Sequence, residues 1–386
     1  MEEWKEYRLG EIATFSQGIQ VDIKSQFLQK EEGYIRFVRI VDYTKQGEEQ
    51  PRYIQRPNDR YIVSETDLVM IRYGSQTAGK IVRGISGAIA NNTFKVILNQ
   101  NVALNNFVYY YLSQNSIREY FMRSQASSTM PAITFEMMGN LKVALPTLQT
   151  QQKIASILSS LDDKIEVNRR INEQLDELAQ ALFKSWLQKA KEKRTIGDMC
   201  NNILDYSKCS YDEVVLVNSS DVTRGIFEHH NYSPNNELKG HFKKRFRMYD
   251  VLYSEIRPRN QHYAYCLFDP DKYIASTRLM ILRNKENIVS SSILYSYILL
   301  NSVQEEFTLK TETRSGTFPQ GKFEDMAQIT LPYHPIEQQT EMTDFLNAVY
   351  DKMWTNQQEI THLTTLRDTL LPKLMSGEID VNEVEL

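Results

Sequence analysis

The chain has 386 residues, enough for two or three domains, and its hydrophobic and charged contents of 41% and 24% are ordinary for a globular protein. No apolar run approaches the length of a membrane span, and the acidic, polar start MEEWKEYRLGE is unlike a signal peptide. The net charge of −4 excludes a uniformly basic nucleic-acid-binding protein, but 10 of the acidic residues, against 3 basic ones, lie in residues 335–386. The remaining chain is close to neutral, so a DNA-binding surface is permitted without being required.

Residues 1–148 are predicted to fold as a mixed α/β domain. Runs of β-branched and aromatic residues predict strands at 34–41, 67–71 and 93–98. The apolar spacing of residues 105–123 predicts a helix.

Residues 149–190 are predicted to form one long helix. The segment contains no Pro or Gly and is rich in Leu, Ala, Gln, Glu and Lys, which favour helix. One set of side chains recurs in steps of four and three, the pattern of a coiled-coil seam. The seam consists of Ile154, Leu158, Leu161, Ile165, Asn168, Asn172, Leu175, Ala179, Leu182 and Trp186.

Residues 191–334 repeat the outline of the first domain. Strands are expected at 213–217, 250–254 and 279–282, and a helix at 291–307. This region has 19 Lys and Arg against 18 Asp and Glu, so it too is nearly neutral.

A second long helix, over residues 335–375, completes the repeat, and an acidic tail of residues 376–386 follows it. The seam recurs in it 188 residues later, as Met342, Leu346, Val349, Met353, Asn356, Ile360, Leu363, Arg367, Leu370 and Leu374. Gln151-Gln152 also recurs as Gln338-Gln339. The predicted fold class is α/β (α+β): two mixed α/β domains separated by two long antiparallel coiled-coil helices, with a pseudo-twofold internal repeat.

The asparagines in the seam predict a specific contact. Antiparallel pairing that matches the two ends of the seam places Asn172 beside Asn356. A buried amide pair supplies its own donor and acceptor and fixes the register of two helices at some expense in stability. The alternative is that both amides point to solvent.

Motifs for catalysis are not evident in the sequence. It contains no HExxH, no CxxC and no GxSxG, and all six histidines lie in the second half. The three cysteines suggest no disulfide framework, and we expect a cytoplasmic protein. Gly74–Lys80 fits GxxxxGK, but Ile81 stands where a P-loop needs Ser or Thr, and the following residues do not resemble a helix. A nucleotide-binding P-loop protein therefore remains only an alternative.

The same loop suits contacts with DNA, because it combines basic, aromatic and small polar side chains on a glycine-hinged turn. An ordinary β-hairpin is the competing interpretation. The candidate DNA-binding residues are Arg72, Tyr73, Ser75, Gln76, Thr77 and Lys80.

A corresponding loop in the second half carries side chains that commonly contact base edges, and a basic run precedes it. The candidate base-reading residues are Arg257, Arg259, Asn260, Gln261 and His262, and the candidate phosphate contacts are Lys243, Lys244 and Arg245. A solvated basic face is the alternative for the basic run. The two halves differ in these loops while they share a framework, which suggests one scaffold presenting two reading surfaces.

The LPTLQTQQKIASILSSLDDKIEVNRRINEQLDELAQALF segment, the LGEI start and the LP-x(4)-QQ helix entry resemble the DNA specificity subunit of type I restriction-modification enzymes. The resemblance implies two target-recognition domains, each reading half of a split double-stranded DNA target. It also implies that the paired helices dock two modification (methyltransferase) subunits, with restriction subunits as further candidate partners. The subunit itself is then neither catalytic nor cofactor-bound, since S-adenosylmethionine and ATP belong to the partner subunits.

A second apolar stripe on the first helix is the expected docking surface for the modification subunits. Its residues are Ile157, Val167, Ile171, Leu178, Phe183 and Leu187. Packing against the chain's own globular domains is the alternative for this stripe. A purely structural coiled-coil adaptor is the rival function.

Overall fold

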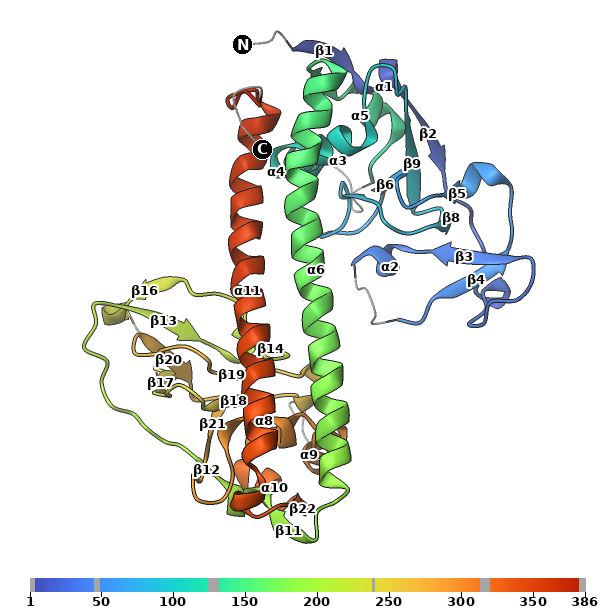
Figure 1. The fold of residues 1–386 in the computed structure, drawn as a ribbon. Coiled ribbons are helices and arrows are strands. Elements are labelled where there is room, and N and C mark those ends of the chain that lie inside the picture. The colour runs from blue at the N-terminus through green and yellow to red at the C-terminus, as the bar shows by residue number, and fades with distance from the viewer. Residues whose placement is uncertain (1–3, 45–48, 124–131, 238–239, 313–319, 382–386) are drawn as a thin grey trace. The chain divides into compact units, whose positions relative to one another are not determined.

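The computed structural model describes residues 4–44, 49–123, 132–237, 240–312 and 320–381 (Figure 1). The chain divides into two compact units, Met1–Glu166 with Thr361–Leu386, and Val167–Ile360. Each unit contains one α/β region and a segment of each of two long helices. These helices are α6 (Leu148–Leu187, 40 residues) and α11 (Thr340–Met375, 36 residues).

Three sheets form the α/β region of the first unit. The strands are β1 (Lys5–Arg8) and β10 (Lys142–Leu145) in one sheet, β2 (Ala13–Gln17), β9 (Thr93–Leu98), β6 (Leu68–Ile71) and β7 (Ile81–Val82) in the second, and β4 (Arg52–Gln55), β3 (Tyr34–Val38), β8 (Gly87–Ile89) and β5 (Ile62–Val63) in the third. The α-helices are α1 (Leu9–Ile12), α2 (Ile40–Thr44), α3 (Asn105–Ser113), α4 (Asn115–Arg123) and α5 (Phe135–Asn140). All neighbouring strands are antiparallel except β3 and β8, which are parallel.

The second unit repeats these three sheets in the same strand order and adds a short hairpin. The strands are β11 (Glu192–Thr195) and β22 (Thr330–Tyr333), then β12 (Cys200–Asn202), β21 (Leu279–Asn284), β18 (Val251–Ser254) and β19 (Tyr263–Tyr265), then β16 (Tyr232–Pro234), β13 (Glu213–Val217), β20 (Tyr273–Ser276) and β17 (Phe242–Lys244), with the hairpin β14 (Val222–Thr223) and β15 (Ile226–Phe227). The α-helices are α7 (Ile196–Met199), α8 (Ser291–Leu299), α9 (Asn301–Glu312) and α10 (Phe323–Ala327). The parallel pair β13–β20 corresponds to β3–β8. The predicted internal repeat and mixed α/β class are confirmed.

Two predicted helices are each broken into two. The prediction over residues 105–123 divides at Gln114, and the one beginning at residue 291 divides at Leu300, where the backbone is extended, with ψ of 138° and 129°. The Gln114 side chain donates to Tyr111 O at 3.0 Å, which satisfies a carbonyl near the end of α3. Neither break contains Pro or Gly, and the sequence prediction did not use the Asn-Ser pair that follows each one, at 115–116 and 301–302.

The strand predicted at residues 34–41 ends early, at Val38. The Arg39 amide donates to Asp42 Oδ2 at 2.8 Å, and this bond begins the short helix α2. A local side-chain-to-backbone bond thus replaces the sheet ladder.

A buried glutamine fixes the start of each long helix to its own α/β region. Gln151 and Gln339 are 0% and 2% exposed, and each side chain accepts one backbone hydrogen bond and donates two. The partners are Leu104 N, Val102 O and Pro146 O for Gln151, and Ser290 N, Ile288 O and His334 O for Gln339, at 2.8 to 3.3 Å. These equivalent contacts satisfy loop groups that would otherwise be buried without partners.

The two long helices pack antiparallel within each unit, as the seam predicts (Figure 1). In the first unit, Asp162 accepts from Arg367 Nη1 at 2.7 Å and from the Tyr110 hydroxyl at 2.7 Å, so one carboxylate joins α6, α11 and α3. Leu182 departs from the seam, since it is 43% exposed and Phe183 is buried instead.

The predicted asparagine pair is confirmed in the second unit. Asn356 Nδ2 donates to Asn172 Oδ1 at 2.8 Å, and Asn172 Nδ2 donates to Met353 O at 3.1 Å. Asn356 is 1% exposed, so its amide is removed from water. One turn away, Asn168 donates to Glu359 at 2.9 Å.

Replacing both members of this pair, by Asn172→Leu with Asn356→Leu, is expected to raise the melting temperature. Two leucine side chains fill the seam without burying an amide. Each kcal/mol gained in the free energy of unfolding raises the melting temperature of a unit of this size by about 2–4 °C. Thermal denaturation measures the effect. The control, Asn172→Leu alone, is expected to lower the melting temperature because it removes the acceptor for the buried Asn356 amide. A lower melting temperature for the double variant would show that the pair is a net stabilising contact.

Candidate nucleic-acid interface

The predicted DNA-binding loop of the first unit connects β6 to β7. Its residues 72–80 form a tight turn in which Gly74 and Gly79 adopt φ of +114° and +77°, the left-handed region that favours glycine. The Thr77 hydroxyl donates to Tyr73 O at 2.9 Å and holds the turn closed. The loop is therefore ordered by its own hydrogen bonds.

This loop is not a P-loop. The backbone amides of residues 77–80 donate to the carbonyls of Gly74, Ile71 and Thr77, so these four amides are not free to cradle a phosphate. Ile81 then begins strand β7, where a P-loop requires a helix. The nucleotide-binding alternative is wrong for both reasons.

Three of the six predicted side chains of the loop are exposed to a ligand, whereas the Thr77 hydroxyl is used within the turn. Ser75, Gln76 and Lys80 are exposed. The Arg72 guanidinium lies 5.1 Å from the centre of the half-buried Tyr73 ring. Among the described residues, neither Arg72 nor Lys80 forms an ion pair. Their role in binding DNA stays a prediction, and their placement is compatible with it.

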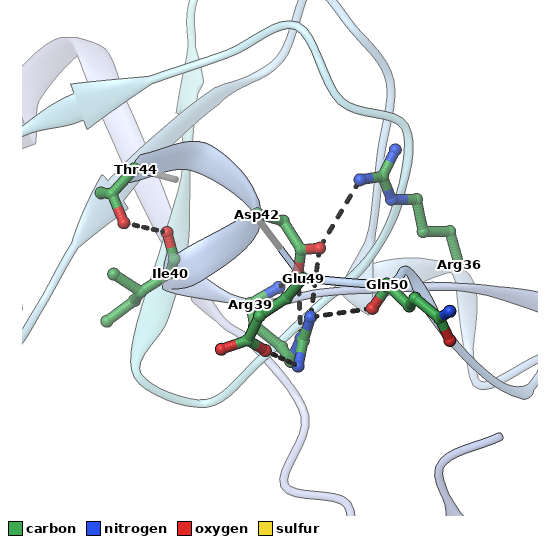
Figure 2. A network of polar contacts seen from close by, with 7 residues as sticks. All are labelled: Arg36, Arg39, Ile40, Asp42, Thr44, Glu49 and Gln50. Carbon is green, nitrogen blue, oxygen red and sulfur yellow. Dashed lines mark hydrogen bonds and ion pairs between the residues drawn. The ribbon is translucent and has the colours of Figure 1, made fainter. Parts of the chain in front are cut away.

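A second cluster of cations in the same unit is neutralised internally (Figure 2). Asp42 is 6% exposed, accepts from Arg39 Nε at 3.1 Å and lies 3.6 Å from Arg36 Nη2. Arg39 Nη1 also donates to Glu49 at 2.9 Å, and Arg39 Nη2 donates to Gln50 O at 3.3 Å. This network holds the connection from β3 to β4, so we assign Arg36 and Arg39 to the framework rather than to the interface.

The predicted base-reading loop of the second unit is the turn from β18 to β19. Arg257 and Gln261 flank the single 3-10 turn Pro258–Asn260 and have left-handed backbones, with φ of 48° and 55°. This conformation is unfavourable for non-glycine residues. Non-glycine residues that do adopt it are concentrated at functional sites. Arg257 and Asn260 are exposed, as base contacts require.

Arg259 and His262 of this predicted set are held by side-chain contacts within the unit. Arg259 forms an ion pair with Glu312, with Nε 2.6 Å from Oε1, so it must leave that carboxylate before it can contact a base. His262 Nδ1 lies 3.0 Å from Val222 O and 3.2 Å from the Thr223 hydroxyl. The His262 ring is thereby held against strand β14.

Sequence reasoning missed Arg224, which the fold brings to the same place. It lies at the tip of the β14–β15 hairpin, is exposed, and has φ of 47°. Its Nε donates to Gln261 Oε1 at 2.7 Å. Arg224 has no basic neighbours in sequence and lies 37 positions from Gln261, so no local pattern marks it.

The predicted phosphate contacts lie at the end of β17, and the alternation of a strand separates them. Lys243 points outward and is exposed. Lys244 points inward, is 3% exposed, and donates to Leu279 O at 2.7 Å. Burial lowers the pKa of the Lys244 ammonium, and Glu255, 4.0 Å away, opposes that shift. The prediction for Lys244 is wrong, because this ammonium cannot reach a phosphate.

Arg245 is half-buried and partly committed to the framework. Its Nη2 donates to Asp271 O at 2.6 Å, and its amide donates to Asp205 O at 2.8 Å. Lys243 is therefore the strongest remaining candidate for a phosphate contact in this run.

Lys243→Ala is expected to weaken DNA binding uniformly across sequences and to reduce the dependence of log K on log salt by roughly one. The matched control is Lys244→Met, which removes the neighbouring charge but is expected to leave the salt dependence unchanged. Equilibrium binding titrations at several salt concentrations check both variants. The reverse result, with only Lys244→Met changing the slope, would contradict the assignment.

The predicted docking stripe on α6 divides into an exposed part and a buried part. Phe183 and Leu187 are 1% and 6% exposed within the core of the second unit, and Ile157 packs against the core of the first. For Phe183 and Leu187 the docking prediction is wrong, and packing against the chain's own domain is confirmed. Ile157 is only half-buried, so its docking role stays a prediction.

An exposed outer stripe remains on α6. Val167, Leu178 and Leu182 are 53%, 46% and 43% exposed, and Ile171 is half-buried. At 100° per residue these four positions fall within roughly 60° of arc, on one face of the helix. The docking role of Val167, Ile171 and Leu178 stays a prediction, and Leu182, which was predicted for the seam, lies on the same face.

The described residues contain no group of three or more His, Cys, Asp or Glu side chains arranged to hold a metal ion. No helix in the described ranges is long and apolar enough to cross a membrane.

Comparison with known proteins accounts for this architecture. The family model described as the type I restriction modification DNA specificity domain matches residues 1–177 and again residues 188–365. The HindI type I restriction enzyme specificity subunit of Haemophilus influenzae is 35% identical over 167 residues, which are 42% of this chain and 36% of that protein. The MjaIX specificity subunit of Methanocaldococcus jannaschii is 23% identical over 325 residues, covering 76% of this chain and 73% of that one. The matched part thus spans about a third of the first relative and about three quarters of the second.

The fold is also similar to a solved structure. The crystal structure of a type I restriction-modification system S subunit from M. genitalium has a TM-score of 0.58 and 16% identity, with 97% of this chain and 96% of that chain covered. Together the two family matches cover most of the chain and coincide with its internal repeat. The chain therefore belongs to the type I restriction modification DNA specificity family and carries the family's domain twice.

Proposed function

We propose that this chain is the specificity subunit of a type I restriction-modification methyltransferase or endonuclease. In this role it reads a split target in double-stranded DNA, with one target-recognition domain for each half. The observation that carries the proposal is the repeated framework with unlike loops. The strand order is the same in both units, but the β6–β7 loop carries Arg72 and Lys80, whereas the β18–β19 turn carries Arg257 and Gln261.

The proposed recognition domains are residues 1–148 and 191–334. In the first, the exposed side chains of Ser75, Gln76 and Lys80 reach the DNA. In the second, the strained turn 257–262 contacts base edges and Lys243 contacts the phosphate backbone. Phosphate contacts position the protein, and the turn supplies the sequence preference.

We further propose that two modification subunits dock on the paired helices, chiefly on the outer stripe of α6. Catalysis then belongs to those subunits, which bind S-adenosylmethionine and methylate adenine, while ATP serves restriction subunits where these join. In this proposal the chain supplies recognition and assembly, and no reaction step.

The test exchanges residues 1–148 for the corresponding residues of another family member and sequences the methylated sites of a host that expresses the complex. One half of the methylated motif is expected to change and the other to stay, because each domain reads its own half. The control exchanges residues 191–334 and should change the opposite half.

Two results would contradict the proposal. If either exchange altered both halves, the domains would not read independently. If the complex with the original chain bound random and target duplexes alike, with no salt-dependent component, the chain would be a structural adaptor instead.

A further inference from the structure

Arg224 and Gln261 come from two separate turns that the fold joins rigidly. The Arg224 amide donates to Gln261 O at 3.0 Å, and the next amide, of Gly225, donates to Tyr263 O at 2.9 Å. The side chains are joined as well, by Arg224 Nε to Gln261 Oε1 at 2.7 Å. The hairpin tip and the β18–β19 turn therefore present one composite surface.

Both residues have left-handed backbones, at φ of 47° and 55°. Each such conformation is unfavourable for a non-glycine residue, and it persists only where the surrounding structure fixes it. The two strained backbones direct the two polar side chains toward each other. Neither side chain fills the core, since Arg224 is exposed and Gln261 is half-buried.

The polarity of the side-chain bond is unambiguous. Arginine Nε can only donate, so its partner on Gln261 must be the carbonyl oxygen and not the amino group. Gln261 then presents its NH₂ group to a ligand, and Arg224 presents Nη1 and Nη2. The free nitrogens of the composite surface are therefore all donors, and the Gln261 oxygen keeps one lone pair.

A free glutamine prefers adenine, because its oxygen accepts from N6 while its amino group donates to N7. Here one of the two lone pairs of that oxygen accepts from Arg224, whose guanidinium adds further donors beside it. Guanine presents two acceptors, O6 and N7, in the major groove, whereas adenine presents N7 beside an N6 amino group that would face another donor. The arginine donors beside Gln261 therefore favour guanine over the adenine that the glutamine alone would suggest.

We propose that Arg224 and Gln261 act as one unit that reads a guanine through N7 and O6 in the half-site of the second recognition domain. This inference rests on the proposed function. Phosphate oxygens also accept hydrogen bonds from these donors. However, the neutral Gln261 amide releases no counterion from DNA, so it would add little to the affinity for a phosphate. A fixed, directional donor pair is suited to a base edge.

The test measures equilibrium binding of the complete methyltransferase complex to duplexes carrying each base pair in turn at every position of that half-site. Arg224→Ala is expected to reduce discrimination for guanine at one position by roughly 5- to 150-fold and to raise the relative affinity for adenine there, because Gln261 Oε1 is released. Gln261→Ala should reduce discrimination at the same position. The double variant should lose no more than either single one, since the two side chains act together.

Two further arms separate base reading from charge. Arg224→Lys keeps the charge but loses the Nε donor, so it should keep the salt dependence and lose the guanine preference. Replacing that guanine by 7-deazaguanine removes the N7 acceptor, which should weaken binding by the original complex but not by Arg224→Ala. The matched control, Arg247→Lys at another exposed arginine of the same unit, should change neither.

Uniform weakening at all positions by Arg224→Ala, with a salt slope lower by about one, would overturn the proposal in favour of a phosphate contact. Unchanged discrimination would overturn it as well. A complex of the original chain that shows no preferred sequence at all would instead refute the proposed function, so the two failures are distinguishable.

Discussion

Leu178→Glu is expected to abolish co-purification of the chain with its modification subunits while the isolated chain stays folded. Leu178 is 46% exposed at the centre of the outer stripe, so glutamate at this position is solvated in the free chain. In a complex that covers the stripe, the same carboxylate is buried without a partner, which costs several kcal/mol. The dissociation constant should therefore rise by more than roughly 100-fold.

The matched control is Leu309→Glu, which changes another exposed leucine on a helix of the same unit. Leu309 is 65% exposed on α9 and lies outside the outer stripe. Co-purification should survive this change, and circular dichroism should show that both variants are folded. Retained assembly in Leu178→Glu would move the docking surface away from α6.

The second large effect is expected from lengthening the helix pair. Four residues inserted after Glu166 in α6 and four after Ile360 in α11 fall at the boundaries between the two compact units, so each unit keeps its own helix contacts. The insertion adds roughly 6 Å and a net rotation of about 40°. If the paired helices set the spacing between the recognition domains, the unread gap in the target should grow by about two base pairs.

Both half-sites should stay as they were, because no residue of either recognition loop is touched. Sequencing of methylated sites in a host expressing the complex reads the gap and the half-sites in one measurement. An insertion in α6 alone is the control, and it should impair folding because the Asn172–Asn356 pair and the Asp162–Arg367 pair can no longer both form. A changed half-site with an unchanged gap would refute a ruler role for the helices.

The fold was predictable to the extent that it is repeated. The seam spacing placed Asn172 beside Asn356, and the hydrogen bond confirms it. The breaks at Gln114 and Leu300 were missed because neither contains Pro or Gly, and the Asn-Ser pairs that begin the following helices were not read as helix starts. The seam also failed at Leu182, because packing within the core of the second unit buries Phe183 in its place.

The candidate site was predictable only in part, since composition finds polar loops but not the direction of each side chain. Lys243 and Lys244 are adjacent and equally basic, and only strand alternation exposes one and buries the other. Arg224 was missed for the opposite reason: it is an isolated arginine whose importance comes from a partner distant in sequence. Pairings across turns cannot be read from a local motif.

Both long helices are divided between the two units, and this division sets the order in which the two units are fully synthesised. The second unit is one continuous segment, Val167–Ile360, whereas the core of the first includes Leu374, Met375 and Val381. Translation proceeds at about 5–20 residues per second. Roughly 10–40 seconds therefore pass between the synthesis of residues 1–166 and that of the C-terminal segment that completes their core. The region synthesised first is therefore the last to become whole, and during that interval the face of the nascent helix that later contacts Leu374 stays open to chaperones and to aggregation.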